Sequence, residues 1–189
     1  MARHVCPWWI GYFLLVPLRK WAQDPRRILE PWVGPGMTVV DVGCAMGYFT
    51  LPLAELVGPT GRVVAVDLQA RMLRTLDRRA RRAGLSGRIE TRRCTAESLG
   101  LSDLAGRVDF ALVFAVAHEV PEVARLMAEL AAALSPQGRA LLAEPSGHVS
   151  AEEFAASIAA AQAAGLTVES RPAIARSRAV LLAAGRSPR

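Results

Sequence analysis

VVDVGCAMGYFT, residues 39–50, is the stretch that decides the fold. It predicts a buried strand ending near an acidic residue, then a turn punctuated by Gly43 and Gly47, then the start of a helix. Glycine at such a turn allows positive φ and close approach of a ligand to the main chain, while the helix directs unpaired N–H groups at that ligand. A second apolar strand, residues 62–67, also ends in a carboxylate. This pair of carboxylates suits a nucleoside whose ribose hydroxyls need an acceptor.

The order of the acidic residue and the glycines separates two kinds of nucleotide site. NAD-type sites carry Gly-x-Gly-x-x-Gly, whose helix N-terminus receives a pyrophosphate. Here the pattern is Asp-x-Gly-x-Ala-x-Gly, and a carboxylate before the glycines repels a pyrophosphate but suits an ammonium group. The motif resembles that of the class I S-adenosylmethionine (SAM) dependent methyltransferases, Asp/Glu-x-Gly-x-Gly-x-Gly. It is closest to the small-molecule and quinone C-methylase branch, and Ala45 stands at that family's middle glycine.

Strands and helices alternate after the break at residues 34–36. We expect strands at 38–42, 62–67, 88–93, 108–114 and 138–144, and helices at 49–57, 70–83 and 122–134. Near-continuous apolar strands separated by helices indicate a parallel sheet covered on both faces. Helix 151–164 is followed by two strands with no helix between them, 166–170 and 176–184. This ending predicts an antiparallel hairpin at the sheet edge.

The resemblance covers about residues 35–184 and agrees with this ending. It implies a Rossmann-like α/β fold: a mostly parallel seven-stranded sheet in the order 3-2-1-4-5-7-6, an antiparallel terminal hairpin and helices on both faces. We expect residues 1–34 to form an aromatic, apolar cap segment and residues 35–189 to form a SAM-dependent methyltransferase domain. Asp24 and Pro25 predict a short helix before the domain, through about Val33, because they are a capping acceptor followed by proline at the first helical position.

Composition sets further limits. The chain has 189 residues, 52% of them hydrophobic and 21% charged, which excludes a disordered chain. Its net charge of +6 comes almost wholly from arginine, concentrated between Arg71 and Arg93. A solvated helix face is favoured over nucleic-acid binding for this run, and no appended RNA-binding module is expected. Three cysteines, an odd number, predict no disulfide framework and a cytoplasmic location.

The N-terminal apolar run, residues 6–18, is flanked by Arg3, Arg19 and Lys20. It is shorter than the about 20 apolar residues that span a bilayer, and it lacks a small-x-small cleavage site. Two interpretations remain: a cap that packs over the active site, or a peripheral membrane contact with tryptophan at headgroup level. We favour the cap.

Ligands of open parallel sheets bind outside the carboxyl ends of the strands, where the strand order reverses. The resemblance implies that the amino-acid end of SAM lies there and that Asp67 accepts the ribose hydroxyls. Thr95 stands where the family often has an aspartate that binds the adenine amino group. A threonine side chain can accept a hydrogen bond there only through its hydroxyl. The full set of cofactor-binding residues expected from the resemblance is Asp41, Gly43, Cys44, Ala45, Gly47, Asp67, Leu68, Thr95, Ala96, Phe114 and Ala115.

Two histidines, His118 and His148, follow the fourth and fifth strands at the same edge. Either can act as a general base, because imidazole exchanges protons near neutral pH; packing over the ligand as a polar lid is the alternative for His118. A substrate pocket is expected from Glu144 and, if the N-terminal segment folds over this edge, from His4, Cys6, Trp8, Trp9 and Tyr12. No ligand spacing supports a metal at His118, His148 and Glu144, so we expect none. The three cysteines also permit thiolate binding of a substrate, as in arsenite methyltransferases, whose cysteine spacing differs.

Methyl transfer from a sulfonium is an in-line displacement that depends largely on proximity and orientation. We therefore expect this chain to transfer a methyl group from SAM to a small-molecule acceptor, with S-adenosylhomocysteine as product. Three alternatives remain open. They are an RNA methyltransferase that uses the surface between Arg71 and Arg93, a membrane-associated methylase of a lipidic quinone, and a non-catalytic SAM-binding protein.

Overall fold

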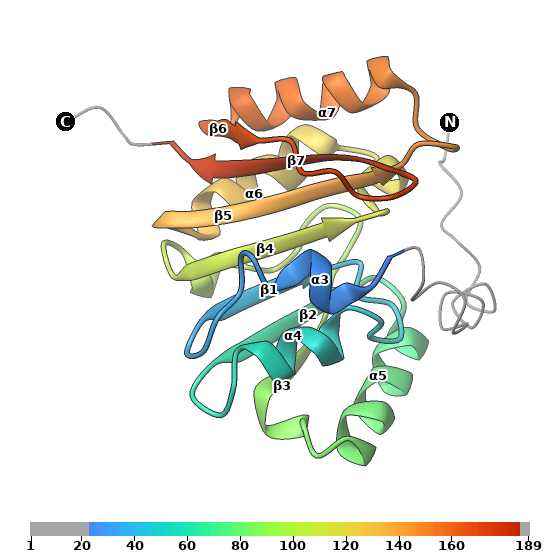
Figure 1. The fold of residues 1–189 in the computed structure, drawn as a ribbon, viewed down its shortest axis with the longest axis vertical. Helices are drawn as coiled ribbons and strands as arrows, with labels where there is room; N and C mark the ends of the chain where they lie inside the picture. Colours follow the sequence, from blue (N-terminus) through green and yellow to red (C-terminus); the bar gives the residue numbers. More distant parts are fainter. Residues whose placement is uncertain (1–22, 186–189) are drawn as a thin grey trace.

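The computed structural model describes residues 23–185, which form a seven-stranded sheet in the order β3-β2-β1-β4-β5-β7-β6 (Figure 1). Strands β1 to β5 are parallel, and β7 runs antiparallel to both β5 and β6. The predicted Rossmann-like fold, its strand order and its terminal hairpin are confirmed. The strands are β1 Thr38–Val42, β2 Arg62–Asp67, β3 Ile89–Arg93, β4 Val108–Phe114, β5 Leu134–Pro145, β6 Leu166–Ser170 and β7 Ser177–Ala184.

Helices cover both faces of this sheet. Alternate strand residues divide the core: Val40 and Val64 pack with the apolar sides of α6 and α7, whereas Val39 and Val63 pack with those of α3 and α4. Helix α5 packs through Leu73 and Leu76, one turn apart on its apolar stripe. The helices are α3 Pro25–Leu29, α4 Thr50–Leu56, α5 Ala70–Arg82, α6 Val123–Ala133 and α7 Ala151–Ala163.

The largest departure from the predicted boundaries is at β5, which begins at Leu134 directly after α6 rather than at residue 138. Leu134 pairs with Val108, and the register then shifts before the next pair. Gly138 lies at this irregularity, where a Cβ atom would come within 2.6 Å of the Val108 carbonyl oxygen. The glycine therefore marks a close backbone approach inside the strand and not its beginning. The first helix is also shorter than predicted, since α3 ends at Leu29.

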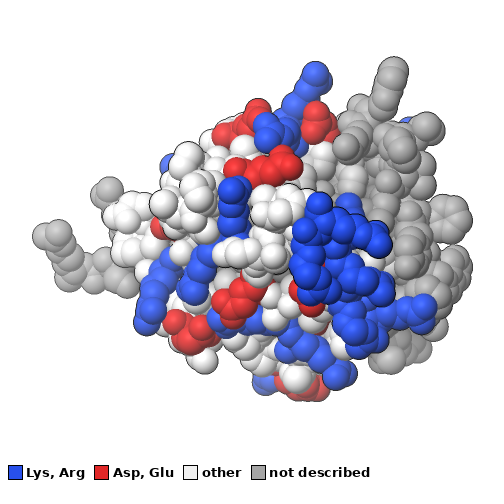
Figure 2. All heavy atoms as spheres, turned by 90° about the horizontal axis from the view of Figure 1, so that it is seen from below, with Lys and Arg blue, Asp and Glu red and all other residues white. Residues whose placement is uncertain are grey.

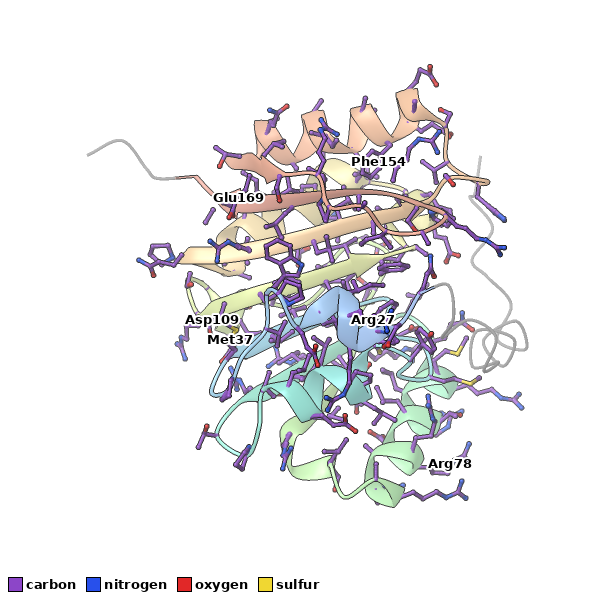
Figure 3. All side chains as sticks on the ribbon, in the orientation of Figure 1. Arg27, Met37, Arg78, Asp109, Phe154 and Glu169 are labelled. Atoms are coloured by element: carbon purple, nitrogen blue, oxygen red, sulfur yellow. The ribbon has the colours of Figure 1, made fainter. Side chains whose placement is uncertain are left out.

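The arginines of α5 lie mostly on its exposed side, with Arg71, Arg74, Arg78, Arg81 and Arg82 all exposed. Figure 2 shows basic side chains gathered on the face seen from below, and Arg78 projects away from the sheet in Figure 3. A solvated helix face stays our interpretation of this run. Within residues 23–185, no helix is both long enough and apolar enough to cross a lipid bilayer.

Candidate functional site

A cavity of about 570 Å³ opens beyond the carboxyl ends of the central strands. This is the position where β1 lies between β2 and β4 and the strand order reverses, which is where open α/β sheets bind their ligands. The loops after β1, β2, β3, β4 and β5 all contribute to its wall. The predicted site residues that line it are Asp41, Gly43, Cys44, Ala45, Asp67, Leu68, Thr95, Ala96, Phe114, Ala115, His118 and His148.

The turn after β1 has positive φ at three alternate positions: 68° at Gly43, 48° at Ala45 and 84° at Gly47. A Cβ atom at Gly43 would lie 2.5 Å from Val116 Cγ2, and one at Gly47 would overlap Leu76 Cδ1. Both glycines are therefore required by packing as well as by backbone conformation. Gly47, which we expected at the cofactor, does not line the cavity, because its Cα faces Leu76 of α5.

Ala45 holds a left-handed conformation that costs a residue with a side chain about 1–3 kcal/mol. Two interactions hold the turn around it. The Ala45 N–H donates to Asp67 Oδ2 at 2.9 Å, and the guanidinium of Arg79 donates to the Met46 carbonyl. Burial lowers the pKa of this arginine. Arg79 thus differs from its neighbours on α5, because it supports the turn from the helix.

Asp67 joins the end of β2 to this turn. Its side chain accepts hydrogen bonds from two backbone N–H groups, Gln69 at 2.7 Å and Ala45 at 2.9 Å. Burial raises its pKa, and these two hydrogen bonds oppose the rise. Each carboxylate oxygen keeps a further lone pair directed toward other donors. Asp67 therefore supports the start of α5 and still has acceptor capacity at the cavity for a pair of hydroxyl groups.

Asp41 is the more deeply buried carboxyl, 3% exposed, and its Oδ2 accepts a hydrogen bond of 2.6 Å from the Thr50 hydroxyl. Burial raises its pKa to about 7. A cationic group placed beside Asp41 would favour the ionised carboxylate and lower this pKa. The site is thus suited to a ligand that carries an ammonium group.

The raised pKa of Asp41 predicts that stability falls as the pH rises. The folded state keeps a proton on Asp41 that the unfolded chain releases near pH 3.8. The contribution of this proton to the free energy of unfolding is therefore complete below pH 3.8 and is lost as the pH rises through about 7. The loss is on the order of 4 kcal/mol at most. Asp41→Asn should flatten this part of the profile. Urea unfolding at pH 5, 6, 7 and 8 measures it, and an equal slope in both proteins would contradict the assignment.

Thr95 lies in the loop after β3, where its hydroxyl and its backbone hold a turn. Its Oγ1 accepts from the N–H groups of Glu97 and Ser98, both at 3.2 Å, and its own N–H donates to the Ser98 carbonyl at 3.0 Å. A hydroxyl oxygen has two lone pairs, and both are engaged in this turn. The Thr95 hydroxyl therefore holds this turn, and its expected place in the cofactor site stays a prediction.

On the other side of the cavity, Glu144 and His118 form a pair. Glu144, the last residue but one of β5, is 1% exposed. Its Oε1 accepts from the Ala117 N–H at 2.7 Å, and its Oε2 lies 2.5 Å from His118 Nδ1. An ionised carboxylate can only accept, so a hydrogen bond to an ionised Glu144 would place the hydrogen of this contact on Nδ1. Glu144 does not line the cavity, in contrast to the substrate contact expected for it, because both its oxygens are directed at the segment after β4.

Aromatic rings complete the wall near these residues. Phe49 packs against Phe114 with ring centroids 4.5 Å apart and against Tyr48 edge to face at 5.2 Å. Sequence reasoning missed Tyr48 and Phe49, although both directly follow the glycine turn.

His148 lies in the loop after β5, exposed at the same cavity. The remaining residues expected at the substrate, His4, Cys6, Trp8, Trp9 and Tyr12, lie outside the described residues.

The buried thiol of Cys44 lines the turn, where burial first, and then the nearby carboxylates, raise its pKa well above the ordinary value. Burial also raises the pKa of Cys94 to about 11. Raised pKa values make both thiols weak nucleophiles and weak metal ligands. In the part of the chain from 23 to 185, no three His, Cys, Asp or Glu side chains are grouped as a metal site would require.

Comparison with known proteins gives a consistent result. A family model described as a methyltransferase domain matches residues 34–175. Ribosomal protein L11 methyltransferase of Pelotomaculum thermopropionicum is 33% identical over 147 residues, 75% of this chain and 42% of that protein. Demethylmenaquinone methyltransferase of Bacillus cytotoxicus is 27% identical over 128 residues, 68% of this chain and 52% of that protein. The chain spans about half the length of these curated relatives.

A solved structure shares the whole fold. The crystal structure of a SAM dependent methyltransferase from Aquifex aeolicus superposes with a TM-score of 0.82 at 22% identity, covering 95% of this chain and 98% of that one. The resemblance predicted from the sequence is confirmed, and with it SAM as the cofactor of the family.

Proposed function

Because the chain belongs to the methyltransferase-domain family, we propose that it transfers the methyl group of SAM to a small organic acceptor. One observation carries the proposal. A single cavity is lined by Asp41 and Asp67 from the ends of β1 and β2 and by a histidine that contacts the buried carboxylate of Glu144, from the ends of β4 and β5. Its volume of about 570 Å³ is in the range of small-molecule sites.

The donor chemistry of the cavity fits SAM. Asp41 would face the ammonium group, the turn around Ala45 would approach the amino-acid part, and Asp67 would accept the two ribose hydroxyls. Hydrophobic side chains near Asp67, such as Leu68 and Met72, provide apolar surface for a base. When bound, SAM supplies an electrophilic methyl group on a sulfonium sulfur.

His118 is the proposed general base of the acceptor side. Its Nε2 would take the proton of the acceptor, while Nδ1 stays hydrogen-bonded to Glu144. The buried carboxylate fixes the tautomer and the ring orientation and stabilises the imidazolium that forms. Glu144 is thus a positioning residue, and the Ala117 N–H bond to its other oxygen fixes the carboxylate in turn.

A small molecule is favoured over a macromolecular acceptor by the walls of the acceptor side. Phe49, Phe114 and Pro145, the last residue of β5, supply apolar surface to the cavity that His118 also lines. The arginines of α5 lie on its exposed side, whereas Arg125 is the one arginine among the described residues that line the cavity. Within residues 23–185, a phosphate backbone would therefore meet few basic groups in this cavity.

A panel assay tests the proposal. The protein is incubated with labelled SAM and with phenols, quinols, amines, thiols and RNA, and S-adenosylhomocysteine is measured. We expect product with at least one organic class and none with RNA. Binding of SAM without turnover on any acceptor would instead support a non-catalytic SAM-binding protein, and salt-dependent methylation of RNA would support the RNA alternative.

A further inference from the structure

The charge of the cavity is opposite in sign to that of the chain. The whole chain has a net charge of +6, from 23 lysine and arginine residues against 17 aspartate and glutamate residues. Among the described residues that line the cavity, carboxyl side chains outnumber the one arginine. The carboxyl residues are Asp41, Asp67, Glu97, Glu119, Glu122 and Glu129, and the arginine is Arg125. They belong to β1, β2, α6 and the segments after β3 and β4, so the fold brings together carboxylates that are far apart in the sequence.

Few cations in the described part of the chain balance these carboxylates. Arg125 is exposed, and its guanidinium donates to the backbone carbonyl of Glu97 at 3.3 Å rather than to a carboxylate. The cavity therefore has an excess of negative charge, which acts strongly on a ligand because many of the other wall residues are apolar. Within residues 23–185, no ion pair is formed by Asp41, Asp67, Glu97, Glu122 or Glu129.

Several of these carboxylates also keep acceptor capacity that the described residues do not use. Asp41 is 3% exposed, and of its two oxygens Oδ2 is bonded to Thr50, which leaves Oδ1 for a group in the cavity. Glu129 holds the Leu99 N–H through Oε2 at 2.9 Å and keeps Oε1. Glu122 directly precedes α6, but its side chain makes no capping hydrogen bond to the helix. The carboxylates are thus available to a cationic ligand.

Methyl transfer changes the charge of the bound donor. SAM carries a sulfonium, an ammonium and a carboxylate group and is a cation overall, whereas S-adenosylhomocysteine has lost the sulfonium charge and is neutral overall. At a separation of about 8 Å and an effective dielectric constant of about 40 to 80, one carboxylate changes the affinity for a unit charge about 2-fold to 6-fold. Several carboxylates around one cavity therefore add up to a large difference between donor and product.

We propose that the acidic lining of this cavity selects its nucleoside ligand by charge: the protein binds cationic SAM more tightly than neutral S-adenosylhomocysteine, and the loss of charge on methyl transfer promotes release of the product. The inference rests on the proposed function, because the two ligands are the donor and the product of that reaction. Apart from the sulfonium charge, they differ by one methyl group.

Calorimetry with SAM and S-adenosylhomocysteine tests this at about 0.01 M and about 1 M sodium chloride, where the Debye length is about 30 Å and about 3 Å. The unmodified protein should prefer SAM by about 10-fold or more at low salt and by less at high salt. Glu97→Gln/Glu122→Gln/Glu129→Gln removes three cavity carboxylates with little change of shape, and it should reduce this preference by about 10-fold. Arg125→Gln removes the opposing charge and should increase the preference about 2-fold to 6-fold.

Three exposed glutamates outside the cavity provide a matched control. Glu30, Glu152 and Glu169 do not line it, and replacing all three by glutamine changes the net charge of the chain by the same amount. This control variant should keep the preference for SAM of the unmodified protein. Thermal melting of each variant checks that it is folded.

The possible contrary results have different meanings. If the unmodified protein binds S-adenosylhomocysteine as tightly as SAM or more tightly, the inference is wrong. It is also wrong if the folded cavity variant keeps the full preference for SAM, or if the control variant loses as much of it. If neither ligand binds to the unmodified protein, the proposed function fails instead.

Discussion

Asp67→Ala is expected to weaken SAM binding by about 100-fold or more. The carboxylate would accept both ribose hydroxyls, and hydrogen bonds to a charged acceptor contribute about 1.5–3 kcal/mol each. The change also removes the acceptor of the Ala45 N–H, which holds the turn against the end of β2. Calorimetry with SAM measures the loss of affinity. Asp67→Asn keeps one oxygen acceptor, so its affinity for SAM should lie between those of the unmodified protein and Asp67→Ala.

Asp109 provides a control near the amino end of β4, at the opposite end of the strands from the cavity (Figure 3). Its Oδ2 accepts from the Thr38 N–H at 2.9 Å, so Asp109→Ala removes a comparable carboxylate-to-backbone contact far from the cavity. It should lower stability without changing the affinity for SAM. Unchanged SAM affinity in Asp67→Ala would show that Asp67 does not bind the ribose. An equal loss of SAM affinity in Asp67→Ala and Asp109→Ala would indicate general destabilisation instead.

His118→Ala is expected to reduce kcat by about 10²-fold to 10⁴-fold on an acceptor whose proton must be removed, with little change in SAM affinity. Glu144→Gln should also reduce kcat, because it changes which nitrogen of the His118 imidazole carries the hydrogen. The new amide can still accept the Ala117 N–H, but its NH₂ group would donate to Nδ1 and place the hydrogen on Nε2. A base with its lone pair on Nδ1 cannot take the proton of the acceptor.

This second effect can be measured without an acceptor. Nitrogen-15 shifts of the His118 ring should show hydrogen on Nδ1 in the unmodified protein and on Nε2 in Glu144→Gln. A merely structural role for Glu144 would not produce this exchange of tautomers. Full turnover in His118→Ala would remove the imidazole from the mechanism.

Sequence reasoning predicted the fold well because its signals are local. Strands β1, β2 and β4, which end at the cavity, are apolar runs closed by a turn or a polar residue. The two final strands without a helix between them predicted the hairpin. At β5 the same reasoning failed. Gly138 resembles a strand boundary, but it lies inside the strand, where the register shift places it against Val108.

The site was predicted less completely, for physical reasons that differ by residue. Gly47 is required by a contact with Leu76 that no local pattern reveals. Glu144 and His118 were both identified, but their pairing depends on β4 and β5 being adjacent and in register. Thr95 is different: threonine followed by serine three residues later is a local turn signal that could have been recognised from the sequence.

The central claim is that one cavity binds the donor across the ends of β1 to β3 and presents it to His118. A crystal structure of the protein with S-adenosylhomocysteine tests this most directly. We predict both ribose hydroxyls within hydrogen-bond distance of Asp67 and the sulfur directed toward the side of the cavity that holds His118. A ligand bound elsewhere, or bound here with its ribose away from Asp67, would contradict the account.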